Sequence, residues 1–181
     1  IERAALPNAP ISLVYHGSLA LRNECSAQAL DALVETAGAP VFVDVNLRSP
    51  WWSRAALEAR LTQARWVKLN RDELVLLSDR NGDTEVLASR LLQRHALNTA
   101  IVTLGERGAL LMTNDGQVVH APAVPSACVV DTVGAGDAFS SVCILGLRHN
   151  WSPRTLLARA QAFASHVVGQ RGATGEDRHP Y

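Results

Sequence analysis

The segment 130–139 reads Val-Asp-Thr-Val-Gly-Ala-Gly-Asp-Ala-Phe and joins a glycine-rich turn to the start of an apolar helix. Gly134 and Gly136 carry no side chain, so backbone N–H groups can approach a ligand closely, and the first turn of a helix leaves those groups without helical partners. Such a turn attracts anions such as phosphate. A carboxylate at Asp137 would face the same place, which makes chemical sense only if it takes a proton from an attacking hydroxyl. The segment therefore predicts phosphoryl transfer.

Two better-known nucleotide-binding loops do not fit this segment. A dinucleotide fingerprint needs a third glycine three residues after Gly136, where Phe139 stands, and a Walker A loop needs a Gly-Lys pair that the chain lacks. A bare Gly-x-Gly-Asp sequence is also compatible with a plain turn at the start of a helix. The residues around the turn must decide between these interpretations.

Composition limits the kinds of partner. The chain has 181 residues, of which 48% are hydrophobic, and this is enough for one well-packed core. Its 17 basic residues balance its 17 acidic residues, so no basic excess indicates nucleic-acid or membrane binding. We therefore expect small-molecule partners, no nucleic acid and no membrane.

Three widely spaced cysteines, Cys25, Cys128 and Cys143, form no CxxC pattern and predict a reduced intracellular protein in which each thiol is buried. No run of eighteen apolar residues occurs, and the first residues lack the layout of a signal peptide. These features predict a cytoplasmic protein. Because the chain begins without an initiator methionine, we expect it to be processed, truncated or incomplete.

Apolar, β-branched runs alternate with helical patterns along the chain. Strands are expected at 11–15, 41–46, 66–70, 99–104, 109–113 and 118–121. Helices are expected from Ser26 to Gly38, after Ser53, at about 71–77 and 83–95, from the glycine-rich turn to about 149, and from 152–153 onward. This order predicts an α/β fold with a mostly parallel sheet, helices on both faces and some antiparallel strands toward the C-terminal part. We expect a single domain over residues 1–181.

Polar side chains lie at the ends of two of the expected strands. Asp44 and Asn46 fall on one face at the end of the strand 41–46, because side chains alternate along a strand. In the same way Lys68 and Asn70 share a side, and Glu73 follows on the next helical turn. The last three groups are therefore expected to converge at the carboxyl edge of the sheet, where α/β proteins bind ligands.

Four motifs, in order, resemble those of the PfkB, or ribokinase-like, family of carbohydrate kinases. Asp131 and Thr132, followed by the glycine-rich turn and the apolar helix, resemble the family's second signature. Asp44-Val45-Asn46-Leu47-Arg48, followed by Pro50-Trp51-Trp52, resembles the segment that reaches the sugar in fructokinase-like and 2-keto-3-deoxygluconate-kinase-like members. Residues 67–74 resemble the Asn-x-x-Glu motif, and residues 102–109 resemble the nucleotide-side Thr-x-Gly-x-x-Gly loop.

This resemblance implies roles for the residues of the glycine-rich turn. Asp137 would be the base that accepts the proton of the sugar hydroxyl, and Gly134, Ala135 and Gly136 would donate N–H groups to the transferring phosphoryl group. A monovalent cation, K⁺ for example, would be held near Asp131 and the Val133 carbonyl, with residues 171–174 supplying further oxygens.

The resemblance also implies a sugar site and a nucleotide site. Asn46 and Arg48 would contact the sugar. The nucleotide, ATP with Mg²⁺, would be bound by Lys68, Asn70, Glu73, Thr103, Gly105, Gly108 and Thr132. Glu73 would act on Mg²⁺ through water.

Several of these residues have simpler interpretations. Asn46 could cap its loop, Arg48 could pair with a surface carboxylate, and Lys68 could form a helix-end ion pair with Glu73. The glycines of 105–108 could serve turn geometry alone. Trp51 and Trp52 fit packing anchors better than stacking platforms. The six histidines show no metal-binding spacing and are expected to be structural or solvated.

The resemblance covers nearly the whole chain, but only as the later portion of a family member. Relatives begin with further sheet strands and a small β lid that closes over the sugar and often forms a dimer contact. We therefore expect these parts to lie outside this chain, and we expect the protein to form a homodimer through the lid. The expected activity is transfer of the γ-phosphoryl group of ATP to fructose or a related ketose. Alternatives are 2-keto-3-deoxygluconate, which Arg48 would suit, a nucleoside, or a catalytically incomplete regulatory member.

Overall fold

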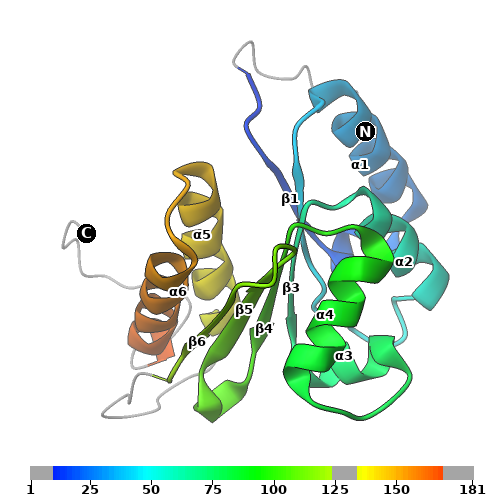
Figure 1. The fold of residues 1–181 in the computed structure, drawn as a ribbon. Helices are drawn as coiled ribbons and strands as arrows, with labels where there is room; N and C mark the ends of the chain where they lie inside the picture. Colours follow the sequence, from blue (N-terminus) through cyan, green and yellow to red (C-terminus); the bar gives the residue numbers. More distant parts are fainter. Residues whose placement is uncertain (1–9, 124–133, 169–181) are drawn as a thin grey trace. The chain divides into compact units, whose positions relative to one another are not determined.

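The structure is a computed structural model that describes residues 10–123 and 134–168 (Figure 1). The chain divides into two compact units. One consists of Ile1–Thr103 with Met112–Val118, and the other of Leu104–Leu111 with Val119–Tyr181.

The strands of the described ranges form one six-stranded sheet in the order β1-β2-β3-β4-β5-β6. The strands are β1 (Val14–Gly17), β2 (Val41–Asp44), β3 (Trp66–Asn70), β4 (Thr99–Thr103), β5 (Ala109–Thr113) and β6 (Val118–Ala121). Parallel pairing joins β1 to β2, β2 to β3 and β3 to β4. The tight turn after β5 makes the next connection a hairpin, in which Thr113 N–H donates to Gln117 O at 3.0 Å. The predicted mostly parallel sheet, with antiparallel strands toward the C-terminal part, is confirmed.

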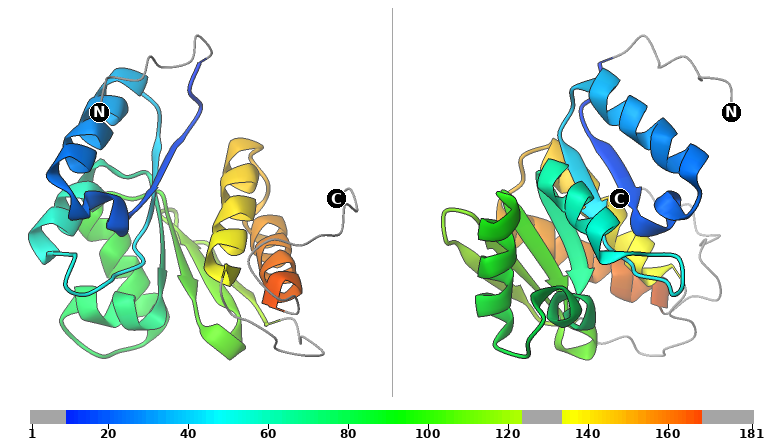
Figure 2. Two further views of the ribbon diagram at one scale, coloured as in Figure 1. Left: turned by 180° about the vertical axis from the view of Figure 1, so that it is seen from behind. Right: turned by 90° about the vertical axis from the view of Figure 1, so that its right-hand side faces the viewer.

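Four helices belong to the first unit: α1 (Glu24–Ala37), α2 (Arg54–Gln63), α3 (Arg71–Ser78) and α4 (Thr84–His95). They lie on the same side of β1–β4 in Figures 1 and 2, and α2, α3 and α4 each contact the strand that bears the same number. Local sequence fixes several helix ends. Ser53 accepts the N–H of Ala56 at the start of α2, and Gly38 ends α1 with φ 57°, as expected for these two residues.

Three boundary predictions were wrong. The helix α1 begins before Ser26, because the Asn23 side chain accepts the N–H groups of Cys25 and Ser26 and Ser26 lies inside the first turn. The first strand is shifted toward the C-terminus and includes His16 and Gly17. The second strand ends at Asp44, so Asn46 stands in the following loop.

In the second unit, α5 (Ala135–Arg148) and α6 (Pro153–Val168) pack against each other. A Cβ at Gly146 would lie 2.9 Å from Leu156 Cγ, so the glycine permits the close approach of the two helices. Cys143 is buried, as predicted, whereas Cys25 is exposed, contrary to the prediction, and Cys128 lies outside the described residues. The short 3₁₀ turns η1 (Ser18–Arg22) and η2 (Gly105–Arg107) follow β1 and β4.

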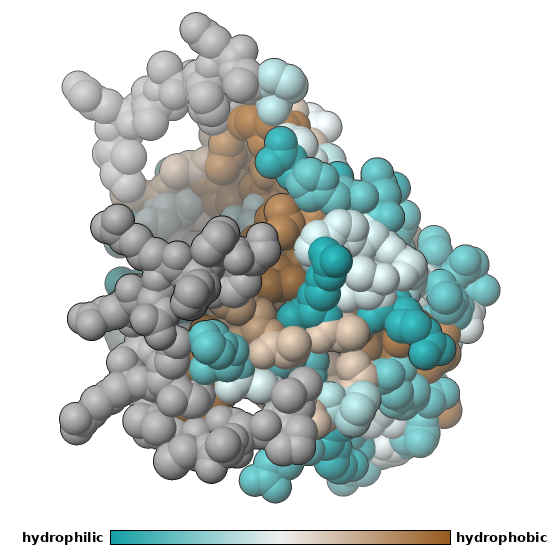
Figure 3. All heavy atoms as spheres, turned by 90° about the vertical axis from the view of Figure 1, so that its left-hand side faces the viewer, coloured by the Kyte–Doolittle hydropathy of each residue, from teal (hydrophilic) through white to brown (hydrophobic). Residues whose placement is uncertain are grey.

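Apolar side chains are also found at the surface. Figure 3 shows a face on which hydrophobic residues gather beside an area of hydrophilic residues. Among the described large hydrophobic side chains Trp51 is the most exposed, at 56%. Within the part of the chain that the structure describes, no helix combines the length and apolar character that crossing a membrane requires.

Candidate active site

Asp44 and Lys68 form an ion pair at the carboxyl edge of β2 and β3. The parallel register places Gly17 beside Asp44 and Asp44 beside Lys68, so these residues stand in one row across three strands. Lys68 Nζ lies 2.9 Å from Asp44 Oδ2 and 3.1 Å from Oδ1, and the Tyr15 hydroxyl donates to Oδ2 at 3.1 Å. Both charged residues are buried, with exposed fractions of 3% for Asp44 and 8% for Lys68. The predicted nucleotide ligand Lys68 is thus held by a carboxylate.

Glu73 accepts hydrogen bonds from the backbone of two segments, of which only the contact within α3 follows from the Asn-x-x-Glu spacing. Its Oε2 accepts the N–H of Asn70 at 2.8 Å, and Asn70 Oδ1 accepts the N–H of Glu73 at 2.9 Å, which is the capping box of α3. Its Oε1 accepts the N–H of Leu47 at 2.7 Å, and the side chain is buried. The interpretation of Lys68 and Glu73 as a helix-end ion pair was therefore wrong.

Asn46 and Arg48 lie in the loop between β2 and α2, and both are exposed. Asn46 adopts φ 34°, a left-handed conformation that few residues other than glycine and asparagine tolerate. Its carbonyl oxygen accepts the Ser18 hydroxyl at 3.0 Å, and Val45 N–H donates to the Lys68 carbonyl at 2.9 Å. Sequence reasoning singled out neither Tyr15 nor Ser18 as functional, although the polar residues after the first strand were an available signal.

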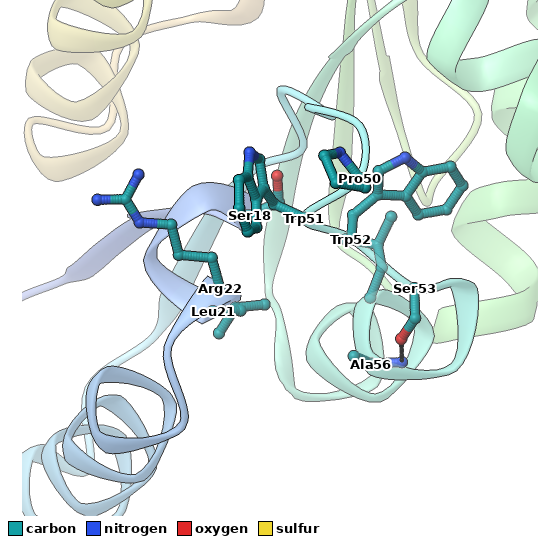
Figure 4. Close-up of a pocket in the computed structure, with 9 residues that line it drawn as sticks. Ser18, Leu21, Arg22, Pro50, Trp51, Trp52, Ser53 and Ala56 are labelled. Carbon is teal, nitrogen blue, oxygen red and sulfur yellow. Dashed lines mark hydrogen bonds between the residues drawn. The ribbon is translucent and has the colours of Figure 1, made fainter.

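A pocket of about 300 Å³ lies beside this loop (Figure 4). Its lining includes Ser18 and Arg22 from η1 and Trp51 and Trp52 from the segment before α2. Figure 4 shows that the two indoles point in different directions. Trp52 is half-buried, but Trp51 is mostly exposed, so its interpretation as a packing anchor was wrong.

The two glycines of the predicted nucleotide-side loop have different structural reasons. Gly105 has φ 62° with no atom within 4 Å of an added Cβ, whereas Gly108 has φ 91° and an added Cβ would overlap the carbonyl oxygen of Ala121. The loop is closed by two bonds, Leu104 N–H to Gly108 O at 2.8 Å and Gly108 N–H to Gly105 O at 3.0 Å. Turn geometry and packing against β6 therefore account for Gly108. Thr103, the last residue of β4, is half-buried and pairs with Asn70 of β3.

The predicted helix after the glycine-rich turn is confirmed as α5. Gly134 precedes it with φ 83° and gives it no side-chain cap. Ala135, Gly136 and Asp137 form the first turn, where N–H groups lack helical partners, and both Gly136 and Asp137 are exposed. Ser140 Oγ donates to Gly136 O at 2.9 Å. This helix end can bind an anion and presents a carboxylate beside it.

The predicted site residues fall into two groups. Asn46, Arg48, Lys68, Asn70, Glu73 and Thr103 belong to the first unit, and Gly105, Gly108 and residues 134–137 belong to the second. Asp131, Thr132, Val133 and residues 171–174 lie outside the described residues.

The described histidines, cysteines and carboxylates do not gather into a metal site. Across 10–123 and 134–168, no cluster of three His, Cys, Asp or Glu side chains could hold a metal ion. His16 and His95 are buried, and burial lowers the pKa of each below the usual 6.5. The structural role of these two side chains stays a prediction.

Comparison with known proteins confirms the family that the four sequence motifs predict. Residues 2–179 match the family described as pfkB family carbohydrate kinase. The chain is 36% identical over 157 residues to a fructokinase of Klebsiella pneumoniae. The aligned region covers 81% of this chain and 50% of that protein.

The solved structures that resemble the chain include two kinases with bound ligands. Aminoimidazole riboside kinase from Salmonella enterica, complexed with aminoimidazole riboside and an ATP analog, matches with a TM-score of 0.74 and 32% identity over 93% of this chain and 60% of that one. A fructokinase double mutant from Vibrio cholerae O395, with fructose, ADP and potassium ion bound, matches with a TM-score of 0.75 and 26% identity over 96% of this chain and 59% of that one. The chain spans about half the length of the curated relatives that it matches. Given the match over residues 2–179, the chain belongs to the pfkB family of carbohydrate kinases.

Proposed function

We propose that the protein containing this chain transfers the γ-phosphoryl group of ATP to a hydroxyl of a sugar or riboside, with fructose or a related ketose as the first candidate acceptor. Asp137 takes the proton of that hydroxyl, and the N–H groups of residues 134–136 stabilise the charge of the transferring group.

The observation that carries this proposal is the start of α5. An exposed carboxylate stands in the first turn of a helix that begins at a left-handed glycine. A carboxylate in the first turn of a helix can serve the helix alone, but beside a glycine-rich turn that can hold a phosphoryl group it can also serve a chemical purpose. Proton removal from an acceptor hydroxyl is such a purpose.

Two relatives support the choice of acceptor. The Klebsiella protein is a fructokinase, and the Salmonella structure contains a riboside. Fructose, aminoimidazole riboside, nucleosides and 2-keto-3-deoxygluconate are therefore the acceptors to compare. Arg48, which is exposed in the loop after β2, would favour the acidic sugar if its guanidinium reaches the acceptor.

ATP, Mg²⁺ and K⁺ are the proposed ligands. An ATP analog in one related structure and ADP with potassium ion in the other support ATP and K⁺. Mg²⁺ is proposed because a metal ion neutralises the phosphate charge in phosphoryl transfer. Glu73 is proposed to act on Mg²⁺ through water, and Asp131 with the Val133 carbonyl is proposed to hold K⁺. Homodimerisation through a lid outside this chain stays a prediction.

The test is an assay of ADP release by the full-length protein against the panel of acceptors, with Mg²⁺ and with or without K⁺. We expect one acceptor class to be phosphorylated with much higher kcat/KM than the others. Binding of ATP without turnover on any acceptor would instead favour a regulatory family member and would contradict the proposal.

A further inference from the structure

We infer that Ser18 and Glu73 are positioning residues. They hold the Asn46–Leu47 peptide group at its carbonyl oxygen and at its N–H, and so orient the loop between β2 and α2. The inference rests on the proposed function in one respect: it takes Asn46 and Arg48 as the residues that meet the acceptor. The two hydrogen bonds that fix this peptide group, called the grip below, are present in the structure whether or not that assignment holds.

One peptide group accepts a hydrogen bond from one buried side chain and donates a hydrogen bond to another. Its carbonyl oxygen, from Asn46, accepts the Ser18 hydroxyl at 3.0 Å. Its N–H, from Leu47, donates to Glu73 Oε1 at 2.7 Å. Ser18 and Glu73 are exposed by only 4% and 8%. The two side chains come from different elements, the 3₁₀ turn after β1 and the first turn of α3, so both must be in place for the peptide to be fixed.

The conformation of this segment explains why a grip is needed. Asn46 has φ 34°, which costs free energy for any residue with a Cβ, and it follows directly after Val45, whose N–H still bonds to Lys68 O of β3. The chain therefore leaves the sheet through one unfavourable residue. Fixing the next peptide group at its oxygen and its nitrogen holds that residue in place, and this sets the directions in which the exposed side chains of Asn46 and Arg48 leave the loop.

Glu73 is suited to this role by its charge and its two oxygens. Oε1 accepts from Leu47 while Oε2 accepts from Asn70, so one carboxylate ties the loop after β2 to the start of α3. Glutamine has one acceptor oxygen and an NH₂ donor, so it can accept from one of these N–H groups and places a donor against the other. Ser18→Ala removes the opposite contact and touches neither the carboxylate nor α3.

Ser18→Ala separates the fixing of this peptide group from the proposed role of Glu73 at Mg²⁺. In the full-length protein, loss of a hydrogen bond to a charged group predicts an acceptor KM raised about tenfold or more for Glu73→Gln, and loss of a neutral one predicts about fivefold for Ser18→Ala. The KM for MgATP and the Mg²⁺ dependence should stay unchanged in Ser18→Ala, because Ser18 has no proposed part in nucleotide or metal binding, whereas Glu73→Gln should alter them as well as the acceptor KM. Matched controls are Glu35→Gln on the exposed face of α1 and Ser78→Ala, whose hydroxyl bonds within α3.

Acceptor KM values equal to wild type in both variants, or a change confined to MgATP and Mg²⁺, would overturn the inference. A second measurement does not depend on turnover. Amide hydrogen exchange at Leu47, followed by NMR, should accelerate about tenfold or more in Glu73→Gln and less in Ser18→Ala. Unchanged protection at Leu47 in both variants would refute the grip. Absence of turnover in the wild type would refute the proposed function alone and would leave the exchange result to decide the grip.

Discussion

Lys68 and Asp44 share a buried ion pair in which Lys68 Nζ lies 2.9 Å from Asp44 Oδ2. Lys68 is the only lysine of the chain. Asp44 also accepts the Tyr15 hydroxyl, so the pair belongs to a small hydrogen-bonded group that joins β1, β2 and β3. A lysine held in this way adds rigidity to the edge of the sheet from which the loop with Asn46 and Arg48 departs.

Removal of the lysine should destabilise the fold strongly. Lys68→Met leaves the Asp44 carboxylate buried without its cation, which costs about 3–5 kcal/mol of the free energy of unfolding. The measurement is urea denaturation of the full-length variant. The exposed Arg90→Met on α4 is the control, and the double variant Asp44→Asn with Lys68→Met should recover part of the loss. A Lys68→Met variant as stable as its control would contradict the buried pair.

Gly105→Ala and Gly108→Ala form a matched pair within one loop. Both glycines have positive φ, so each alanine should cost about 1–2 kcal/mol for the left-handed conformation. Only the Cβ at Gly108 meets backbone, where it would overlap Ala121 O, so that variant should lose much more stability or fail to fold. Thermal unfolding compares the two variants. Equal losses would show that the Gly108 contact with Ala121 does not constrain the loop.

Asp137→Asn should abolish most turnover and keep nucleotide binding. Removal of a general base typically lowers the rate by about 10²–10⁴-fold, while the N–H groups of the helix start are unaffected. The measurements are kcat from ADP release and the ATP dissociation constant from calorimetry. Asp72→Asn, which also alters an exposed carboxylate in the first turn of a helix, is the control. A kcat in the wild-type range for Asp137→Asn would refute the assignment of the base.

The stability of the fold should fall as the pH falls below about 6.5. Burial is the main cause that lowers the pKa of His16; the bond to Gly17 O raises this pKa, and the charge of Arg60 lowers it. Burial also lowers the pKa of His95, where Arg94 acts in the same direction and Glu58 in the opposite one. Below the usual value of 6.5 the unfolded chain binds protons that the folded chain does not, so the free energy of unfolding decreases with decreasing pH.

Each of these histidines contributes a slope of at most about 1.4 kcal/mol per pH unit, and the contribution vanishes above the unfolded pKa, where both states are neutral. Urea denaturation between pH 5 and pH 8, a range of about three units around the unperturbed histidine pKa, measures it. His16→Gln and His95→Gln should each flatten the curve, with exposed His149→Gln as the control. A slope unchanged by both core substitutions would contradict the predicted effect of burial.

The sequence by itself determined the order of the elements, several of their ends and the location of the glycine-rich helix start. These features depend on interactions within a few residues: Ser53 caps α2, Gly38 ends α1, and the left-handed Gly134 precedes α5. Local hydrogen bonds and glycine conformations can be inferred from neighbours in the chain. For the same reason the motif around Asp137 is recognisable in the amino-acid sequence alone.

Tertiary structure alone decided which partners the polar residues of the sheet edge take. Lys68 pairs with Asp44 across 24 residues, Ser18 reaches the Asn46 carbonyl across 28 residues, and Glu73 reaches the Leu47 N–H across 26 residues. Parallel strands are separated by helices, so such partners meet only after the sheet has formed. The spacing of Lys68, Asn70 and Glu73 predicted that polar groups gather there, but only the packed sheet could show that Lys68 binds Asp44 and that Glu73 binds Leu47.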